Sequence, residues 1–590
     1  MNSPTVGLVG TGPTIDAVAA ALADVNAETV ECSPERIGAT DFAVVAGEAG
    51  ADVFSAADLA VREAGTPWLA VELGGVGGRT LADVDAAVSG FAPATACWEC
   101  LRTRVTANLD EEGGNENGDA SDSDAGSARF AGALAGREAA TLLSGGESPV
   151  LGGVVEVPHA ERTVLPVPGC EVCADDSGAD SDTGLDREYR DTDLEETLSR
   201  AEQAVDERVG VVSSIGEAES FPAPYYLANL SETIGFSDAQ AAEQSAGVAD
   251  DWNEALMKAL GEALERYGAG VYRTSDFESA SAPELESMVG DSSVVRPEEF
   301  VRPDEWPDPA GDEIAWVAGE KLRTGEAVHL PAEFVQFPPP EARYKPAITT
   351  GLGLGSSTVE ALLSGVYEVI ERDATMLAWY STFEPLGLSV ESERFDTLRS
   401  RARAENLDVT ALLVTQDVDV PVVAVAVHRE GEWPRFAVGS DADLNPESAA
   451  ESALAEALQN WMELRSMGEQ DAADAEGAIG RYADFPEEAR EFVAPETTVP
   501  SASVGPADAL AGEAELDALR SRLADENLPA YAVRLTPRDV AQLGFEAVRV
   551  LIPDAQPLFT GDAFFGERAR GVPSSLGFEF RPDREHHPYP

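Results

Sequence analysis

The chain has 590 residues, which is enough for two or three domains with hydrophobic cores of their own. Its 108 acidic residues outnumber the 40 basic ones, and the formal net charge is −68. This balance disfavours nucleic acid as a partner, because phosphates are bound by clustered lysine and arginine.

The acidic side chains are spread along the whole chain, and only three lysines occur: Lys258, Lys321 and Lys345. We interpret this composition as adaptation to concentrated salt, with an acidic surface for a basic partner as the alternative. The sequence has no run of 18 apolar residues, and its start lacks the basic and apolar regions of a signal peptide. We therefore expect a cytoplasmic protein without a membrane partner, whose five cysteines stay reduced.

The first predicted unit is an α/β domain of the Rossmann type. Its predicted elements are a strand from Thr5, a helix over 14–24 and strands over 27–31 and 42–46. Gly10 and Gly12 lie at the first turn, where a dinucleotide phosphate can sit on a helix N-terminus. Ile15 stands where the third glycine of that fingerprint is expected, so we favour a tight turn with nothing bound.

Two acidic stretches, residues 109–127 and 174–186, hold almost no large apolar side chain. They cannot offset the entropy cost of ordering, so we interpret them as mobile linkers. The predicted domains are therefore residues 1–175, interrupted by the linker over 109–127, and residues 195–590, with an acidic linker over 174–194 between them.

Four of the five cysteines form two C-x-x-C pairs: Cys97 with Cys100, and Cys170 with Cys173. Two such pairs can complete a closed tetrahedral Zn(Cys)₄ site, which would be structural because no position is open to water. Four unrelated thiols or a redox dithiol are the alternatives. Cys32 is left over as a core thiol.

A Rossmann-like start followed by two late C-x-x-C pairs resembles the E1-like (ThiF-like) adenylating enzymes, including their partner subunits in azoline peptide biosynthesis. The resemblance covers about residues 1–175. Active adenylators hold ATP with arginine and lysine near the glycine turn, whereas here no lysine precedes Lys258. For this domain the resemblance therefore implies docking of a peptide substrate rather than adenylation.

In the body of the chain, the stretch TTGLGLGSS over residues 349–357 precedes a predicted helix. Alternate glycines followed by serines are typical of a phosphate-facing loop and a helix N-cap. On that helix Glu360, Glu368 and Glu371 share one face, where Mg²⁺ would relieve their repulsion. A solvated acidic face is the alternative. Asp373 falls within the apolar stripe of the helix and requires a buried partner.

Two further predicted helices carry related motifs. The segment Glu262–Arg266 reads E-x-x-E-R on a helix that starts near Asp251, and Glu456–Gln459 reads E-x-x-Q on a helix over about 446–466. Each segment alone is typical of an ordinary amphipathic helix.

Two E-x-x-E-R segments about a hundred residues apart, with a later E-x-x-Q, resemble the YcaO family over roughly residues 195–590. The second has the fuller form S-x-x-E-x₇-E-x-x-E-R-D, from Ser357 to Asp373. The resemblance implies an α+β domain that binds Mg²⁺–ATP. It implies magnesium ligands at Glu262, Glu265, Glu360, Glu368, Glu371 and Glu456. It implies nucleotide contacts at Ser357, Arg266, Arg372 and Gln459.

The chain ends in His586-His-Pro588-Tyr-Pro590. Azoline-forming YcaO enzymes often end in a P-x-P-x-P tail that reaches the active site, which implies catalytic roles for Pro588 and Pro590, with His586 in place of the first proline. A frayed terminus is the alternative, and we predict neither helix nor strand over residues 560–590.

Three positions depart from the family pattern. Gln244-Ser-Ala-Gly247 stands where Gly-Lys-Gly is usual, Lys258 lies near the place of a serine, and Met462 replaces a basic residue. The first nucleotide-contacting segment is thus altered.

The resemblance implies ATP-dependent cyclodehydration of Cys, Ser or Thr to azolines in a ribosomally made precursor peptide, as in bacteriocin biosynthesis. It further implies a homodimer and a flavin dehydrogenase as a partner, and the composition is of haloarchaeal type. The alternatives are thioamidation with sulfide, a non-catalytic peptide-binding scaffold, and an E1-like adenylating enzyme.

Overall fold

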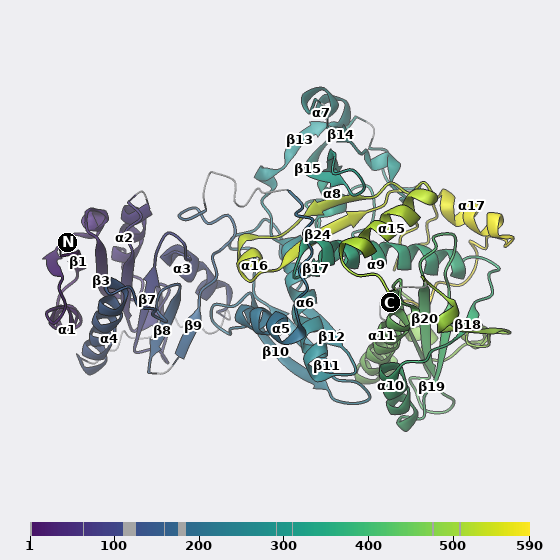
Figure 1. The fold of residues 1–590 in the computed structure, drawn as a ribbon, viewed down its shortest axis with the longest axis horizontal. Coiled ribbons are helices and arrows are strands. Elements are labelled where there is room, and N and C mark those ends of the chain that lie inside the picture. The colour runs from purple at the N-terminus through teal and green to yellow at the C-terminus, as the bar shows by residue number, and fades with distance from the viewer. Residues whose placement is uncertain are drawn as a thin grey trace.

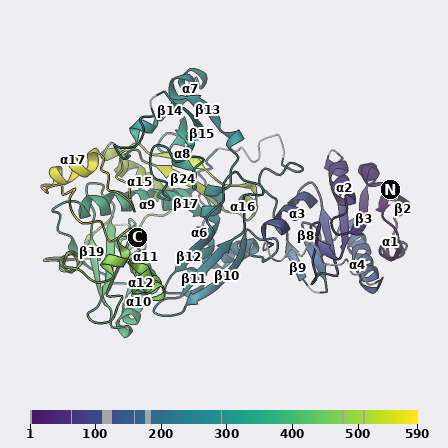
Figure 2. The same cartoon turned by 180° about the vertical axis from the view of Figure 1, so that it is seen from behind.

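The structure is a computed structural model that describes residues 3–62, 64–109, 125–158, 160–174, 184–290, 292–309, 311–474, 477–506 and 509–590. The chain forms a smaller N-terminal lobe and a larger C-terminal lobe (Figure 1). The view from behind shows the same division (Figure 2). Among the described residues, no helix combines the length and apolarity that a membrane span needs.

The N-terminal lobe is built on one sheet in the order β2-β1-β3-β4-β7-β8-β9. Its strands are β1 (Thr5–Val9), β2 (Glu28–Glu31), β3 (Phe42–Glu48), β4 (Trp68–Leu73), β7 (Ala86–Phe91), β8 (Gly153–Val157) and β9 (Ala160–Thr163), and a small hairpin joins β5 (Gly75–Val76) to β6 (Arg79–Thr80). The strands β1 to β4 pair in parallel, and β7 to β9 are antiparallel. The predicted Rossmann-like start is therefore confirmed.

Helices cover both faces of this sheet. The helices α1 (Pro13–Leu22) and α4 (Ala125–Leu143) pack on one face, and α2 (Val53–Arg62) and α3 (Trp98–Ala107) pack on the other. Gly10 has a φ of 115°, and a Cβ there would lie 2.6 Å from the carbonyl oxygen of Ala46. A glycine is required at that turn because the backbone approaches β3 so closely.

The described part of the C-terminal lobe contains three larger sheets. The first joins β10 (Val212–Glu219), β11 (Tyr225–Leu230) and β12 (Gln244–Val248). The second joins β14 (Ser293–Val294), β16 (Ala327–Pro331), β15 (Glu313–Lys321), β23 (Tyr531–Arg534), β24 (Glu546–Leu551) and β17 (Leu352–Gly355), with β13 (Glu278–Ser281) beside β15. The third joins β21 (Phe436–Ala442), β20 (Val422–His428), β19 (Asp408–Leu413), β18 (Leu386–Ser389) and β22 (Thr498–Pro500).

Three long helices lie between these sheets (Figure 1). Helix α6 (Trp252–Gly270) packs on the first sheet, α9 (Thr358–Trp379) on the second and α11 (Pro446–Met467) on the third. Each helix has an N-cap whose side chain accepts a backbone hydrogen bond: Asp251, Ser357 and Asn445. The three helices that were predicted to carry the motifs are therefore confirmed.

The remaining helices are shorter and surround this centre. They are α5 (Leu194–Ala201), α7 (Ala282–Met288), α8 (Ala332–Val335), α10 (Glu393–Ala404), α12 (Glu469–Ala472), α13 (Ile479–Tyr482), α14 (Glu487–Phe492), α15 (Glu513–Asp525), α16 (Arg538–Gln542) and α17 (Glu567–Leu576).

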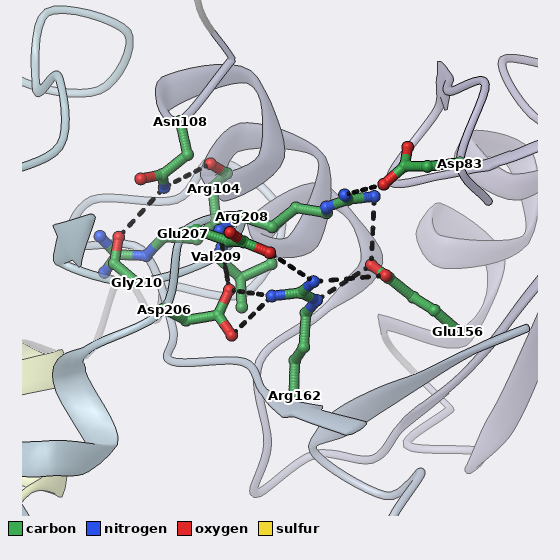
Figure 3. Close-up of polar contacts among 10 residues, drawn as sticks. All are labelled: Asp83, Arg104, Asn108, Glu156, Arg162, Asp206, Glu207, Arg208, Val209 and Gly210. Atoms are coloured by element: carbon green, nitrogen blue, oxygen red, sulfur yellow. Dashed lines mark hydrogen bonds and ion pairs between the residues drawn. The ribbon is translucent and has the colours of Figure 1, made fainter. Parts of the chain in front are cut away.

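The lobes meet at a network of ion pairs, which Figure 3 shows in close-up. Arg162 of β9 donates to Asp206 at 2.8 Å and to Glu156 at 3.1 Å. Arg208 donates to Asp83 at 2.7 Å. Because Asp206 and Arg208 follow α5 at the start of the C-terminal lobe, these pairs join that segment to the N-terminal sheet.

A fully buried group joins the lobes deeper in the contact. Arg104 of α3 forms an ion pair with Asp539 of α16, and the Tyr267 hydroxyl donates to the same carboxylate at 2.6 Å. Arg104 also donates to the Tyr267 oxygen at 3.3 Å. Since Tyr267 follows Arg266 in the first E-x-x-E-R motif, this contact places the N-terminal lobe one residue from that motif.

Two expectations about loops are corrected. Of the predicted linker over 174–186, residues 175–183 lie outside the described residues. Its predicted end is wrong, because Leu185 is already buried in the core of the C-terminal lobe and Arg187 donates to the carbonyl oxygen of Leu322. The helix α17 lies within residues 560–590, where no helix was predicted. Of the linker over 109–127, residues 125–127 belong to α4 and 110–124 lie outside the described residues.

Candidate active site

The carboxylates of the first motif lie on α6 and are held by local contacts. Glu262 accepts the backbone N–H of Ala246 at 2.9 Å, so it is tied to strand β12. Arg266 pairs with both glutamates of its motif, at 3.3 Å from Glu262 and 3.1 Å from Glu265. Burial raises the pKa of Glu265 to about 7, with Arg266 opposing the shift and Glu368 of α9 adding to it. The first and second motifs therefore approach each other at this point.

The second and third motifs meet around Ser440 of β21. Its hydroxyl donates to Glu371 at 2.6 Å, and its backbone N–H donates to Glu456 at 2.6 Å. Arg372 lies 3.5 Å from Glu371 and 3.9 Å from Glu456. Glu371 is only 5% exposed, so the predicted alternative of a solvated acidic face is excluded for this residue.

Negative charge is concentrated around that serine. Burial raises the pKa of Glu371 well above its usual value, and Arg372 opposes the shift while Glu456 and Asp441 add to it. Burial likewise raises the pKa of Asp441 to about 7, and the nearby ammonium group of Lys258 opposes that shift. Buried carboxylates that disfavour one another's charge are a donor set suited to hard cations such as Mg²⁺.

Glu368 connects the cluster to the glycine-rich stretch. It accepts the backbone N–H of Gly351 at 2.9 Å, just before β17. The guanidinium of Arg549 on β24 is buried, and its charge opposes the rise in the pKa of Glu265. It donates to the carbonyl oxygen of Thr349 at 2.7 Å. The stretch before α9 is thus held from both sides.

Three predicted site residues make other contacts. The Ser357 hydroxyl caps α9 by accepting the N–H of Glu360, and the Glu360 carboxylate accepts the N–H of Ser356 at 2.8 Å. Gln459 donates to Glu463 at 3.0 Å. Their described contacts are therefore local, and nucleotide or metal roles for them stay predictions.

Four residues of this region were missed in the sequence: Ser440, Asp441, Lys258 as a cluster neighbour, and Arg549. Ser440 and Asp441 lie near the end of β21 and belong to no recognisable motif. Lys258 lies one turn before Glu262 on α6, so the helical period alone could have drawn attention to it.

The C-terminal tail reaches this site. His587, Pro588 and Tyr589 are buried, whereas Pro590 is exposed. The mark of the C-terminus falls within the outline of the larger lobe in both views (Figures 1 and 2). Burial raises the pKa of Tyr589, and Arg584, Glu371 and Arg372 are the charged groups that act on it. A frayed terminus is excluded.

The tail is anchored along its length. The Nε2–H of His587 donates to the carbonyl oxygen of Phe559 at 2.7 Å, and the Tyr482 hydroxyl donates to the carbonyl oxygen of His586 at 2.7 Å. The Tyr589 hydroxyl is buried and has no hydrogen-bond partner among the described residues. The end of the chain therefore presents one unpaired hydroxyl near the second motif.

Asp373 has the buried partner that its position requires. It accepts hydrogen bonds from Arg568 of α17 at 2.6 and 3.2 Å and from the backbone N–H of Gln556 at 2.8 Å. Arg568 also pairs with Asp417 at 2.8 Å. The last residue of the second motif thus anchors the segment that leads to the tail.

The four paired cysteines form one cluster at the lobe boundary. Their sulfur atoms all lie within 4.8 Å of one another: Cys97, Cys100, Cys170 and Cys173. Asp58 accepts the backbone N–H groups of Trp98 and Glu99 and so orients the first turn of α3, while Arg538 of the other lobe donates to Cys173 at 3.5 Å. Four convergent thiols fit a closed zinc site, as the spacing predicted.

The fifth cysteine lies elsewhere. Cys32 is half-buried beside Gly7 rather than fully in the core.

Several known proteins resemble this chain. A heterocyclase in complex with substrate and cofactor aligns with a TM-score of 0.74 and 19% identity, covering 98% of this chain and 83% of that one. The heterocyclase TruD aligns with a TM-score of 0.67 and 18% identity, covering 100% and 84%. YcaO from Methanopyrus kandleri, bound with AMPPCP and Mg²⁺, aligns with a TM-score of 0.50 and 24% identity, covering 63% and 93%.

At the sequence level, an uncharacterised protein of Methanothermobacter thermautotrophicus is 29% identical over 339 residues, which are 54% of this chain and 82% of that protein. Residues 246–556 match the family described as YcaO cyclodehydratase, ATP- and Mg²⁺-binding. That match spans more than half of the chain and all three motif helices. The chain therefore belongs to the ATP- and Mg²⁺-dependent YcaO cyclodehydratases.

Proposed function

We propose that this cyclodehydratase acts on a ribosomally made precursor peptide and converts Cys, Ser or Thr residues to azolines. The observation that carries this proposal is the buried tail. The charges of Glu371 and Arg372 act on the pKa of its Tyr589, so the tail lies close to the second motif. The alignment over the whole chain with two heterocyclases supports it.

The proposed reaction removes one water from the peptide at the cost of one ATP. The side-chain sulfur or oxygen of the substrate loses its proton and adds to the preceding carbonyl carbon, which closes the ring. The resulting oxyanion takes the γ-phosphoryl group of ATP and ADP leaves. The C–O bond then breaks, phosphate leaves, the amide nitrogen loses its proton and the C–N bond becomes C=N. The balance is peptide and ATP to azoline, ADP, phosphate and one proton.

Within this proposal the protein positions charge rather than supplying covalent chemistry. Glu262, Glu265, Glu360, Glu368, Glu371 and Glu456 would hold Mg²⁺, which neutralises the phosphates. Arg266, Arg372, Ser357 and Gln459 would contact the nucleotide. The fixed φ of Pro588 and Pro590 would aim the tail at the reacting peptide bond at a small entropy cost.

For the N-terminal lobe we infer an E1-like domain that docks the peptide and does not adenylate. Its glycine turn has no lysine near it, and its cysteine cluster sits against Arg538 of the other lobe. Zinc there would be structural. Homodimerisation, a flavin dehydrogenase partner and a haloarchaeal origin remain expectations from the sequence.

The test uses three single-residue changes in the tail. Tyr589→Phe removes a hydroxyl that has no described partner, so the folded state should lose little stability. Peptide-dependent phosphate release should fall sharply, while binding of Mg²⁺–ATP stays intact. Pro588→Ala should act in the same direction, and Pro590→Ala should act less because Pro590 is exposed.

The product distinguishes the alternatives. The assay incubates the protein at high salt with ATP and the precursor peptide encoded beside its gene, and measures the peptide by mass spectrometry. Loss of one water per modified residue supports azoline formation. Exchange of oxygen for sulfur with added sulfide would indicate thioamidation instead. An absence of peptide-stimulated ATP consumption would favour the scaffold, and an unchanged rate in Tyr589→Phe would contradict the role of the tail.

A further inference from the structure

A small cavity of about 40 Å³ lies between the stretch 345–350 and strand β24. Two cations line it, Lys345 and Arg549, and most of the remaining lining is apolar, including Phe300, Val369 and Ile552. Among the described residues that line it there is no aspartate or glutamate, although the chain has 108 of them. The cavity is therefore a cationic spot in a strongly acidic protein.

Both cations are buried and incompletely bonded. Lys345 is 7% exposed and Arg549 is 1% exposed. The described contact of the Lys345 ammonium is with the ring of Phe334, 5.3 Å away, and no hydrogen bond or ion pair to it occurs among the described residues. The terminal nitrogens of Arg549 donate to carbonyl oxygens, but its Nε has no partner in the described part of the chain.

Two buried cations that line one cavity are costly without a counter-charge. Burial and the nearby Arg549 charge together lower the pKa of Lys345 to about 7, with Glu333 opposing the shift. Burial also lowers the pKa of Arg549 to about 10. Each group is thus held in an environment that disfavours its charged form.

The nearest carboxylates are committed elsewhere. Glu333 acts on Lys345 at a distance but accepts the backbone N–H groups of Arg343, Tyr344 and Lys345. Glu368 accepts the N–H of Gly351, and Glu265 pairs with Arg266. None of these three carboxylates bonds to either cation side chain.

We propose that this cavity binds a monovalent inorganic anion of the size of chloride between the Lys345 ammonium and the Nε of Arg549. The cavity volume of about 40 Å³ is larger than the roughly 10–15 Å³ that one water needs, which leaves room for a chloride-sized ion and far too little for a nucleotide. The anion supplies the two missing hydrogen-bond acceptors and the missing negative charge at once.

The site has a consequence for the neighbouring motifs. Arg549 holds the carbonyl oxygens of Ile348 and Thr349, and the same stretch continues to Gly351, whose N–H binds Glu368. An anion at Arg549 therefore fixes the stretch that positions a carboxylate of the candidate active site. This role does not depend on the identity of the peptide product.

The direct test is crystallographic and needs neither ATP nor peptide. Full-length protein is crystallised with bromide in place of chloride, and anomalous scattering at the bromine edge locates the ion. We expect a peak in the cavity, in contact with Lys345 and Arg549, and its loss in Lys345→Met. A well-ordered cavity without a bromide peak, or one that holds only water, overturns the proposal.

The solution test compares the melting temperature in chloride with that in gluconate, an organic anion too large for the cavity, at constant sodium and ionic strength. We expect chloride to raise the melting temperature of the wild type and to lose this effect in Lys345→Met. Lys321→Met is the matched control, because Lys321 is exposed and pairs with Glu326 at 2.8 Å. It should keep the wild-type response.

Equal chloride responses in the wild type and in Lys345→Met overturn the proposal. A shift with inorganic phosphate but none with chloride overturns it as well, because it would assign the cations to a phosphate group. If Lys345→Met does not fold, the bromide map of the wild-type protein decides alone. Failure of this test leaves the azoline assay unaffected, since neither uses the readout of the other.

Discussion

Replacing Asp373 by alanine should destabilise the C-terminal lobe by about 3–5 kcal/mol, the range expected when one partner of a buried ion pair is removed. The structure shows where this cost arises. The backbone N–H of Gln556 loses its acceptor inside the core, at about 1–3 kcal/mol, and two charge-assisted bonds from Arg568 are lost. Asp417 still pairs with Arg568, which keeps the total at the lower end.

The measurement is urea unfolding at fixed salt, followed by tryptophan fluorescence. Trp379 reports on the tail, because the Arg584 guanidinium lies 4.0 Å from its ring and its indole N–H donates to the carbonyl oxygen of Glu585 at 2.9 Å. Asp396→Ala is the control, since Asp396 is more than half exposed in its pair with Arg399 and should change stability by less than about 1 kcal/mol. A loss below about 1 kcal/mol in Asp373→Ala would refute the anchoring role.

Three further predictions concern metal, nucleotide and lobe contact. The protein should carry one zinc per chain, and Cys97→Ser with Cys170→Ser should release it and destabilise the N-terminal lobe, as metal analysis and thermal melting would show; zinc retained in the double variant contradicts the site. Glu371→Gln should abolish Mg²⁺–ATP binding in calorimetry while Gly12→Ala leaves it intact, and the reverse pattern would support an adenylating N-terminal lobe. Asp539→Asn should lower the melting temperature and raise the ATP concentration needed for half-saturation. The reason is that it removes the charge of the group that accepts the hydrogen bond of the Tyr267 hydroxyl, next to the first motif. Unchanged ATP binding would make the contact purely structural.

Much of the architecture follows from local patterns in the sequence. The caps at Asp251 and Ser357 and the 3.6-residue period were enough to place α6 and α9, because both signals act within a few residues. The four cysteines could be grouped because metal spacing is itself a local signal. For Asp373, the position on the helix predicted a buried partner but not its identity, because that partner, Arg568, is 195 residues away in the sequence.

The features that were missed depend on contacts between distant segments. Helix α17 contains Pro573, which disfavours a helix locally, and it forms because Ala569 and Val572 pack against Leu377 of α9. Leu185 reads as an isolated apolar residue in an acidic stretch, and only the assembled core shows that it is buried. Ser440 joins two glutamates across α9 and α11, a relation that no spacing along the chain encodes.

Each motif helix packs on a different sheet of the C-terminal lobe: α6 on β12, α9 on β17 and α11 on β21. A nucleotide that bridges the three helices would therefore bind only when all three sheets and their helices are assembled. It would not bind the unfolded chain. At a free concentration a hundred times the dissociation constant, such a ligand adds about 2.7 kcal/mol to the free energy of unfolding. In a lobe made of separate sheets, ATP would then stabilise the fold as well as serve as a reagent. Depletion of ATP would lower the stability of the enzyme that consumes it.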